Sequence, residues 1–583
     1  MNKTVLKRLL SYLKPDRVIV TIVLVVSLIS VILDVQLPKI LGDATTLISE
    51  SYIASNYTSV DLEGVFAIAK TLAILYILAA GLNFLGKYFM SRVASDIIYR
   101  LQKEIDEKFT RLPVRYFDEQ SRGDLLSRAT NDIQTIDDSF SQVSNQIFTT
   151  VLTFFGIIIM MFTVNIPLAI IGFLGIPLSL FIIGLIGKKS STAFANRQET
   201  TGRLNGYIEE YYAGHEIVKA FNYEDRSQAE FQALNDELYE HAWKAQFFSG
   251  LMFPISRLIN NIVYVFVAIV GGLFAASGMI TIGGIQAILQ YMRNISQPMG
   301  DAANMIGLTQ SMLAAAERIF ELLDAEEMEE EGDKEELPAI VGDVQFKHVS
   351  FGYTPEVTLM EDLNIDVKAG ETVAIVGPTG AGKTTVINLL MRFYDITSGA
   401  IEIDGHNIQD YKVDSLRSKV GMVLQDTWLF KGTIRENIRY SRPDATDEEV
   451  VQAAKQAFAD DFIRKLPDGY DTYITEETDN ISGGQKQLLT IARAILASPS
   501  IFILDEATSN VDTRTEMQIQ KAMDHIMEHK TSFVIAHRLS TIRNADVIMV
   551  MDHGEIIERG NHESLMEKQD VYYQLYTGQL DLD

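Results

Sequence analysis

One glycine-rich stretch of the sequence, VAIVGPTGAGKTT, has the residues needed to bind the phosphates of a nucleotide. The apolar run Val373–Val376 predicts a buried strand, and TTVINLLMRF predicts the helix after the loop. Glycines let backbone N–H groups approach phosphates, Lys383 supplies a cation, and the Thr384 hydroxyl suits Mg²⁺. The predicted phosphate-binding residues are Gly377, Pro378, Thr379, Gly380, Ala381, Gly382, Lys383, Thr384 and Thr385.

Polar residues that follow three other short apolar runs complete a hydrolytic site. Asp505 and Glu506 end the run IFILDE, where Asp505 suits a Mg²⁺ contact and Glu506 suits activation of the attacking water. Alone, such an acid pair would more simply cap a helix; beside a phosphate loop, catalysis is the better interpretation. His537 follows FVIA and is predicted to contact the γ-phosphate, and Gln425 follows GMVL and suits a metal or water contact.

A second glycine-rich stretch, DNISGGQKQ, opens another predicted helix. Gly483 and Gly484 expose backbone N–H groups at the start of that helix, which also suits a phosphate. One chain therefore carries two candidate phosphate sites. Tyr353, which precedes the first of them, is either an adenine-stacking residue or an ordinary surface tyrosine.

The first half of the chain has the composition of a membrane domain. Residues Ser139–Gly187 form a run of 49 without a charge, long enough for two spans, and Leu258–Met292 is also free of charges. Two further apolar stretches complete the prediction. The six predicted spans are residues 18–41, 66–87, 139–163, 167–187, 249–276 and 279–300.

Basic residues orient these spans. The N-terminal tail and the two long connections carry Lys and Arg, whereas the loop between the first two spans has neither. Both termini are therefore predicted to be cytoplasmic, and the basic N-terminus does not resemble a signal peptide. The two inner connections are too long for ordinary loops, so we expect the membrane helices to continue into the cytoplasm around short turns.

Beyond the spans, charge and composition divide the chain again. Residues 326–340 carry eight acids between Glu326 and Glu336, which predicts an extended, solvated linker between a transmembrane domain at 1–325 and a soluble α/β domain at 341–583. The net charge of −27 argues against nucleic-acid binding. The absence of cysteine excludes disulfides, thiolate metal sites and a cysteine nucleophile.

Five motifs in order, GPTGAGKTT, VLQD, NISGGQKQ, ILDEATSNVD and IAHRLST, resemble the ATPase domain of ABC transporters. With six spans before it, the whole chain resembles a half-size exporter of the multidrug and lipid type. The resemblance implies ATP and Mg²⁺ as ligands and a second half-transporter chain as partner. It also implies that two ATPase domains close head to tail, so that Ser482, Gly483, Gly484 and Gln485 cover the ATP held by the partner.

By the same resemblance, Tyr353 stacks on adenine, Gln425 joins Mg²⁺ binding to coupling, and Asp512 communicates across the dimer. The two inner turns resemble the coupling helices that dock onto ATPase domains. The implied function is ATP-driven export of amphipathic or hydrophobic compounds, in the multidrug class, across the cell membrane. Lipid or peptide export, also by a homodimer, is the alternative. A channel-like protein whose ATPase only gates is disfavoured by the intact Glu506 and His537.

Departures from the family pattern bear on the partner. Ile481 stands where leucine is usual, Lys486 replaces a common arginine, SNVD stands where SALD is commoner, and TYITEETDN lacks the usual glycines, with only Glu476 matching. Together these resemble the catalytically intact subunit of heterodimeric bacterial exporters. The intact Ser-Gly-Gly-Gln argues for a homodimer, so both remain open with the heterodimer favoured.

Polar residues within the spans are candidates for the substrate path. Asp34 lies at membrane depth in the first span and is predicted either to contact a cationic substrate or to face an aqueous vestibule or a neighbouring helix. Arg257, Asn260 and Asn261 in the fifth span are further candidates. The expected surroundings are the lipid bilayer and hydrophobic or cationic small molecules.

Overall fold

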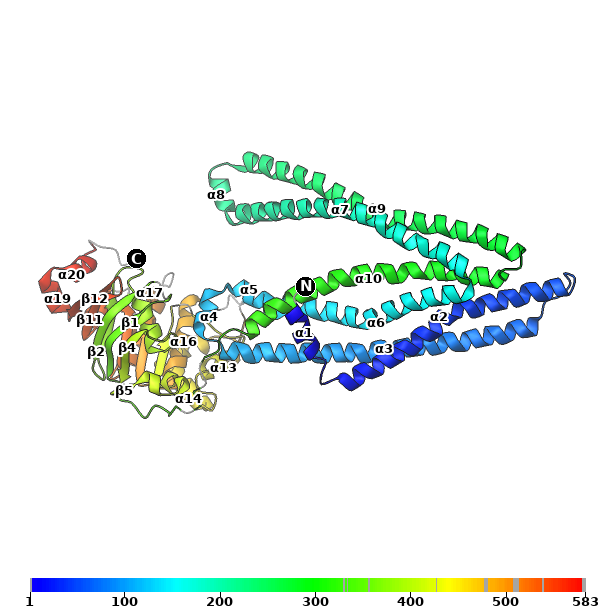
Figure 1. The fold of residues 1–583 in the computed structure, drawn as a ribbon. Coiled ribbons are helices and arrows are strands. Elements are labelled where there is room, and N and C mark those ends of the chain that lie inside the picture. Colours follow the sequence, from blue (N-terminus) through cyan, green and yellow to red (C-terminus); the bar gives the residue numbers. More distant parts are fainter. Residues whose placement is uncertain are drawn as a thin grey trace. The chain divides into compact units, whose positions relative to one another are not determined.

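The computed structural model describes residues 3–328, 331–332, 334–354, 357–425, 427–475, 481–506, 513–536 and 539–578. It divides into two compact units (Figure 1). The membrane unit holds Met1–Thr110 and Arg122–Ala325, and the ATPase unit holds Arg111–Ser121 and Glu326–Asp583. The predicted order, helical first and α/β second, is confirmed. The predicted boundary is wrong in one respect, because Arg111–Ser121 packs with the second unit.

Among the described residues, six helices of at least 32 residues build the membrane unit. The longest runs for 53 residues, about 80 Å at 1.5 Å per residue, against a hydrocarbon core of about 30 Å. The helices therefore continue beyond the membrane, as predicted. They are α2 (Arg17–Ala54), α3 (Leu62–Arg111), α6 (Ile133–Val164), α7 (Ile166–Ala213), α9 (Glu224–Ala276) and α10 (Ile282–Leu323), preceded by α1 (Lys3–Ser11).

Five stretches of the described chain are long and apolar enough to cross a membrane, and they contain the first five predicted spans. The sixth predicted span, residues 279–300, lies in α10, which is not among the five. Gln286, Gln290, Arg293, Asn294 and Gln297 make this part of α10 more polar than the other spans. A crossing at α10 remains a prediction.

Small residues and one buried tyrosine fix α10 against α2. A Cβ atom added to Gly42 would lie 2.3 Å from the carbonyl oxygen of Gly283, so the two backbones touch where both residues are glycine. Farther along, the fully buried Tyr291 donates its hydroxyl to the carbonyl oxygen of Val35 at 2.7 Å. These contacts set which face of α10 points away from α2.

The inner ends of the helices are joined by short helices rather than by loops. The first connection contains α4 (Val114–Glu119), α5 (Arg122–Ser127) and a π-helical turn, Arg128–Asp132. The second contains α8 (His215–Ala220), at the tip of the pair α7 and α9, which run side by side (Figure 1). Tyr207 ties this pair by donating to the carbonyl oxygen of Ser227 at 2.7 Å.

A six-stranded sheet, ordered β12-β11-β3-β10-β9-β6, forms the centre of the ATPase unit. Its neighbours pair in parallel except β12, which runs antiparallel to β11. The predicted strands Val373–Val376 and Ile501–Leu504 lie in β3 and β9. The strands are β3 (Thr372–Val376), β6 (Val420–Val423), β9 (Ile501–Glu506), β10 (Thr531–Ala536), β11 (Val547–Asp552) and β12 (Glu555–Gly560).

A smaller antiparallel sheet, ordered β2-β1-β4-β5, and several helices complete the ATPase unit. The strands are β1 (Val344–Phe351), β2 (Met360–Val367), β4 (Ser398–Ile403) and β5 (His406–Asn407), with a separate pair β7 (Gly432–Thr433) and β8 (Tyr473–Ile474). The α-helices are α11 (Lys383–Leu390), α12 (Val413–Arg417), α13 (Ile434–Arg439), α14 (Asp447–Gln456), α15 (Asp460–Ile463), α16 (Gly483–Ala497), α17 (Thr513–Met527), α18 (Leu539–Asn544), α19 (His562–Lys568) and α20 (Val571–Tyr576).

The predicted solvated linker is wrong at Glu331, Leu337 and Ile340. The Glu331 carboxylate pairs with the mostly buried Arg392 guanidinium at 2.9 Å and accepts a hydrogen bond from the Val413 N–H at 2.6 Å. Leu337 and Ile340 are buried in the core of the ATPase unit. A buried guanidinium requires a counter-ion, so an acid from this block is held in place rather than solvated.

Candidate nucleotide-binding site

The loop between β3 and α11 has a conformation that depends on its glycines. Gly377, Gly380 and Gly382 have φ angles of 149°, 85° and 96°, all in the left-handed region that favours glycine. A Cβ atom on Gly377 would also lie 2.1 Å from the carbonyl oxygen of Met551. Gly382 is the N-cap of α11, so the loop feeds directly into a helix N-terminus. This is the geometry in which backbone N–H groups receive phosphates.

Lys383, the first residue of α11, is held on this phosphate loop (Gly377–Thr384). Its ammonium donates to the carbonyl oxygens of Gly377 at 2.6 Å and Pro378 at 3.1 Å, and the residue is only 9% exposed. A long flexible side chain is thereby restrained beside the loop. The cation is available to any phosphate that the loop binds.

Three predicted metal-binding residues belong to one edge of the sheet or to the loop beside it. Asp505 lies in β9 just before the strand ends, Gln425 follows β6, and Thr384 follows the loop from β3. Because β6, β9, β10 and β3 are parallel neighbours, their carboxyl ends share an edge. Hydroxyl, carboxylate and amide oxygens are the donors that Mg²⁺ prefers, so this set fits the ion. Within the described ranges, no group of three or more His, Cys, Asp or Glu side chains offers another metal site.

Tyr353 contacts α11, the helix that follows the phosphate loop. Its hydroxyl lies 3.0 Å from the Thr385 hydroxyl, and its ring packs edge-on against Phe351 and Tyr394, with centroids 4.9 and 5.0 Å away. The residue keeps 38% of its surface exposed. The structure thus places Tyr353 beside the phosphate loop.

Tyr394 is a contact residue that the sequence does not single out. Its hydroxyl donates to the Asp118 carboxylate of α4 at 2.5 Å, inside the ATPase unit. Burial, and then the hydrogen bond to Asp118, raise the pKa of Tyr394, so the phenol stays protonated and remains the donor at neutral pH. The chain of contacts therefore runs from α4 through Tyr394 and Tyr353 to α11.

The second glycine-rich stretch has a different local geometry. Ser482 caps α16, accepting from the Gln485 N–H at 3.3 Å while its own N–H donates to Gln485 Oε1 at 3.0 Å. Gly483 is exposed, and a Cβ atom added to it would meet nothing within 4 Å. Gly484 is buried. Residues 482–484 are called the Ser-Gly-Gly loop below.

Some predicted residues cannot be placed. His537, Asp512 and Glu476 lie outside the described residues, and of Glu506 only the backbone is described, as the last residue of β9.

In the membrane unit, the structure brings together three of the four predicted path residues. Arg257, Asn260 and Asn261 line one cavity of about 840 Å³. Asp34 is exposed on α2 and is not among the residues that line this cavity. We call this space the membrane cavity.

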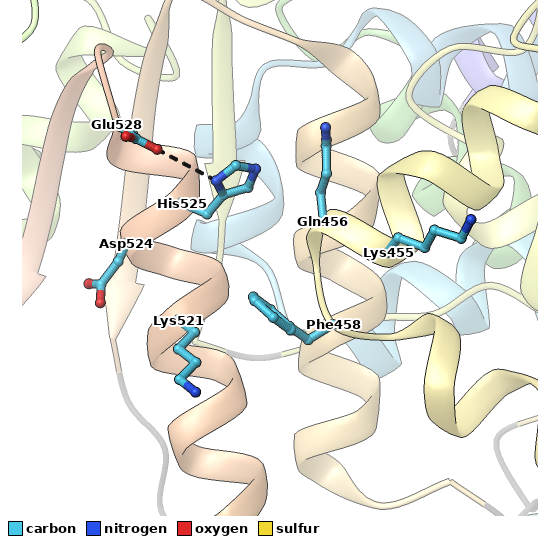
Figure 2. Close-up of a pocket in the computed structure, with 7 residues that line it drawn as sticks. All are labelled: Lys455, Gln456, Phe458, Lys521, Asp524, His525 and Glu528. Carbon is cyan, nitrogen blue, oxygen red and sulfur yellow. Dashed lines mark ion pairs between the residues drawn. The ribbon is translucent and has the colours of Figure 1, made fainter.

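A hollow of about 460 Å³ lies between α14 and α17 of the ATPase unit (Figure 2). Figure 2 shows His525 turned toward Glu528, with which it pairs at 3.7 Å. Two lysines, Lys455 and Lys521, balance two acids there, and none of the residues of the phosphate loop lines it. This hollow is separate from the predicted nucleotide site.

Comparisons with known proteins agree with this architecture. Residues 20–299 match the family described as the ABC transporter transmembrane region, and residues 360–509 match the ABC transporter family. The chain is 44% identical to a fatty acid ABC transporter ATP-binding/permease protein of Mycobacterium tuberculosis, over 97% of this chain and 95% of the relative. It is 35% identical to the ATP-dependent lipid A-core flippase of Syntrophus aciditrophicus, over 88% and 86% of the two chains.

It is also 33% identical to a putative multidrug export ATP-binding/permease protein, YgaD, of Bacillus subtilis, over 98% of this chain and 99% of the relative. Membrane and ATP-hydrolysing domains thus occur in one chain in the order that these relatives share. The chain belongs to the ABC transporter family and is an ABC half-exporter.

Proposed function

We propose that this chain is half of a dimeric ATP-driven exporter, in which its Ser-Gly-Gly loop covers the nucleotide bound by the partner chain. Gly483 carries this proposal. The phosphate-loop glycines are required inside the chain, since positive φ angles exclude other residues there. Among the described residues, nothing requires a glycine at 483, where a side chain would point into open space. Close approach by a group from outside the chain, such as the partner's nucleotide, would explain why this position is a glycine.

In each closed site, Lys383 and the phosphate-loop N–H groups hold ATP, and Tyr353 stacks on its adenine. Thr384, Gln425 and Asp505 hold Mg²⁺, which neutralises phosphate charge. Glu506 orients and deprotonates the attacking water, His537 contacts the γ-phosphate, and Asp512 links the two sites.

Exposed apolar residues around α8 support a dimer as well. Tyr212, Ile217 and Phe221 are 85%, 65% and 77% exposed at the tip of the α7–α9 pair. By contrast, α4 already packs within the ATPase unit of its own chain. We infer that α8 docks on the ATPase domain of the partner, which covers this apolar tip.

We favour a different chain as that partner, because the stretch before the Ser-Gly-Gly loop departs from the family pattern. A homodimer is the alternative. The relatives named for fatty acids, lipid A-core and multidrug export support lipophilic compounds as substrates and the cell membrane as the site of action.

Substitution of Gly483 by alanine tests the proposal. We expect ATP-driven transport in native membranes, where the partner is present, to fall about tenfold or more, because a side chain displaces a charged hydrogen-bonding partner. ATP binding to the chain's own phosphate loop and thermal stability should be unchanged, since alanine favours a helix.

The matched control is Gly206→Ala, which also places a methyl group in open space on an exposed helix. Equal transport by the two variants would show that nothing docks against Gly483.

A further inference from the structure

We propose that the membrane cavity binds the anionic headgroup of a lipophilic substrate, with Arg293 as the main contact and Arg257 as the second. This inference rests on the proposed export function and names the class of substrate. The shared chemistry is a carboxylate or phosphate group at the end of a long apolar tail.

The cavity has the size and walls that an apolar tail requires. Its volume of about 840 Å³ lies in the range of small-molecule sites, about 300–1,000 Å³. It lies among α6, α7, α9 and α10, with Met161, Phe162, Phe173, Ile176 and Met292 on its walls. Methionine and aromatic side chains adapt to flexible tails.

The charges in the cavity select an anion. Arg257 and Arg293 line it, and the one carboxylate among its described lining residues is Asp301, which accepts a hydrogen bond from Gln297 at 3.0 Å. Over the described residues, neither guanidinium has a hydrogen-bond or ion-pair partner. Several other arginines of the membrane unit are ion-paired, for example Arg8 with Asp324 at 2.7 Å and Arg203 with Glu237 at 2.8 Å. Two guanidinium groups therefore stand against one carboxylate, which leaves the cavity with an excess of positive charge.

The predicted depth of Arg293 gives its charge a high free-energy cost when no ligand is bound. It lies about 17 Å along α10 from Ile282, and the span predicted at residues 279–300 therefore puts it near the middle of a hydrocarbon core of about 30 Å. Arg257 lies about 29 Å from the outer end of α9, near the inner surface. A bound anion offsets the cost of a guanidinium at mid-membrane.

The packing of α10 turns Arg293 toward the cavity. Tyr291 is buried against α2, and a residue two positions later lies on the opposite side of a helix. Arg293 and Tyr264 line both the membrane cavity and a second hollow of about 300 Å³ nearer the outer end of α10. Arg293 therefore lies between the membrane cavity and the hollow nearer the outer end of α10.

This class differs from the cationic substrate predicted from Asp34. That residue does not line the cavity, and a cation placed inside would face two guanidinium groups. The guanidinium fork instead matches carboxylate and phosphate oxygens with two parallel hydrogen bonds.

The test uses the assembled transporter in nanodiscs of phosphatidylcholine. Binding is measured for palmitate, its methyl ester, hexadecylamine and a lysophosphatidate, which share a long tail and differ in the headgroup. We expect palmitate and lysophosphatidate to bind at least about tenfold more tightly than the ester, and the amine most weakly. A preference for one anion over the other would identify the headgroup as carboxylate or phosphate.

The variant Arg293→Gln should lose this preference while it binds the ester as before, which also reports that it is folded. Arg293→Lys should restore part of it, and Arg203→Gln, on the inner part of α7, is the matched control. Equal binding of acid, ester and amine by the unaltered protein, or full palmitate affinity in Arg293→Gln, would overturn the inference. If the unaltered protein transports none of the probes when ATP is supplied, the proposed export function is overturned instead.

Discussion

At the scale of single residues, the glycines of the two phosphate-binding motifs are explained by two different constraints. Gly377 and Gly382 are required by backbone angles and by close contacts within the chain. Gly483 has neither constraint, although both kinds of glycine lie in phosphate-binding motifs. The printed sequence makes them look equivalent, and only the surroundings of each Cβ position separate them.

Lys383→Ala should weaken ATP binding about tenfold or more, because the ammonium is the cation of the phosphate loop. The same change leaves the carbonyl oxygens of Gly377 and Pro378 without this donor. Equilibrium binding of a fluorescent ATP analogue measures the effect. Lys455→Ala, which removes an exposed lysine on α14, should bind the analogue normally. Normal affinity in Lys383→Ala would remove this residue from the site.

The contact of Tyr394 marks the limit of residue-level prediction. The phosphate loop, the strand ends and the Ser-Gly-Gly loop can be found because their residues are neighbours in the sequence. Tyr394 meets Asp118, 276 positions away, and no local pattern encodes that pairing. Glu331 and Arg392 are a second such pair.

At the scale of elements, apolar and charged periodicity predicts the positions of helices and strands better than it predicts contacts between distant residues. The strands before the phosphate loop and through Asp505 lie where apolar runs place them, and the long inner helices follow from charged helical patterns. The acidic stretch at 326–340 misleads, because a block of like charge predicts solvation, whereas the ion pair of Glu331 with Arg392 and the burial of Leu337 and Ile340 hold it against the ATPase unit.

We expect Tyr394→Phe to weaken the attachment of α4 to the ATPase unit. The substitution removes only the hydroxyl and costs about 1 kcal/mol, the usual contribution of one hydrogen bond. Stimulation of ATPase activity by substrate should decrease, while basal activity changes little. Tyr473→Phe, at an exposed tyrosine of the same unit, is the control. If Tyr394→Phe retains full stimulation, the contact has no part in coupling.

At the scale of the whole molecule, the open questions concern a second chain. The apolar tip at α8 and the open space at Gly483 both lack a partner within the described residues. No sequence pattern says whether that partner is identical, since the same surfaces serve either arrangement.

The ATPase rate of this chain purified alone in lipid distinguishes the two arrangements, with Glu506→Gln as the blank. For a heterodimer we expect the rate to equal the blank, although the chain is folded and binds ATP, because the Ser-Gly-Gly loop that closes its site belongs to another protein. Turnover clearly above the blank would establish that two copies of this chain complete each other's sites.

Because Arg111–Ser121 belongs to the ATPase unit, recombination between the genes of two half-transporters would affect contacts inside that unit. Half-transporters that exchange their catalytic halves by recombination at residue 341 would separate Tyr394 from Asp118 and Arg392 from Glu331. Each hybrid would inherit a foreign surface at both contacts. An exchange that keeps both contacts must carry Glu331 and the short segment Arg111–Ser121 together with the ATPase half, and these pieces are separated in the gene.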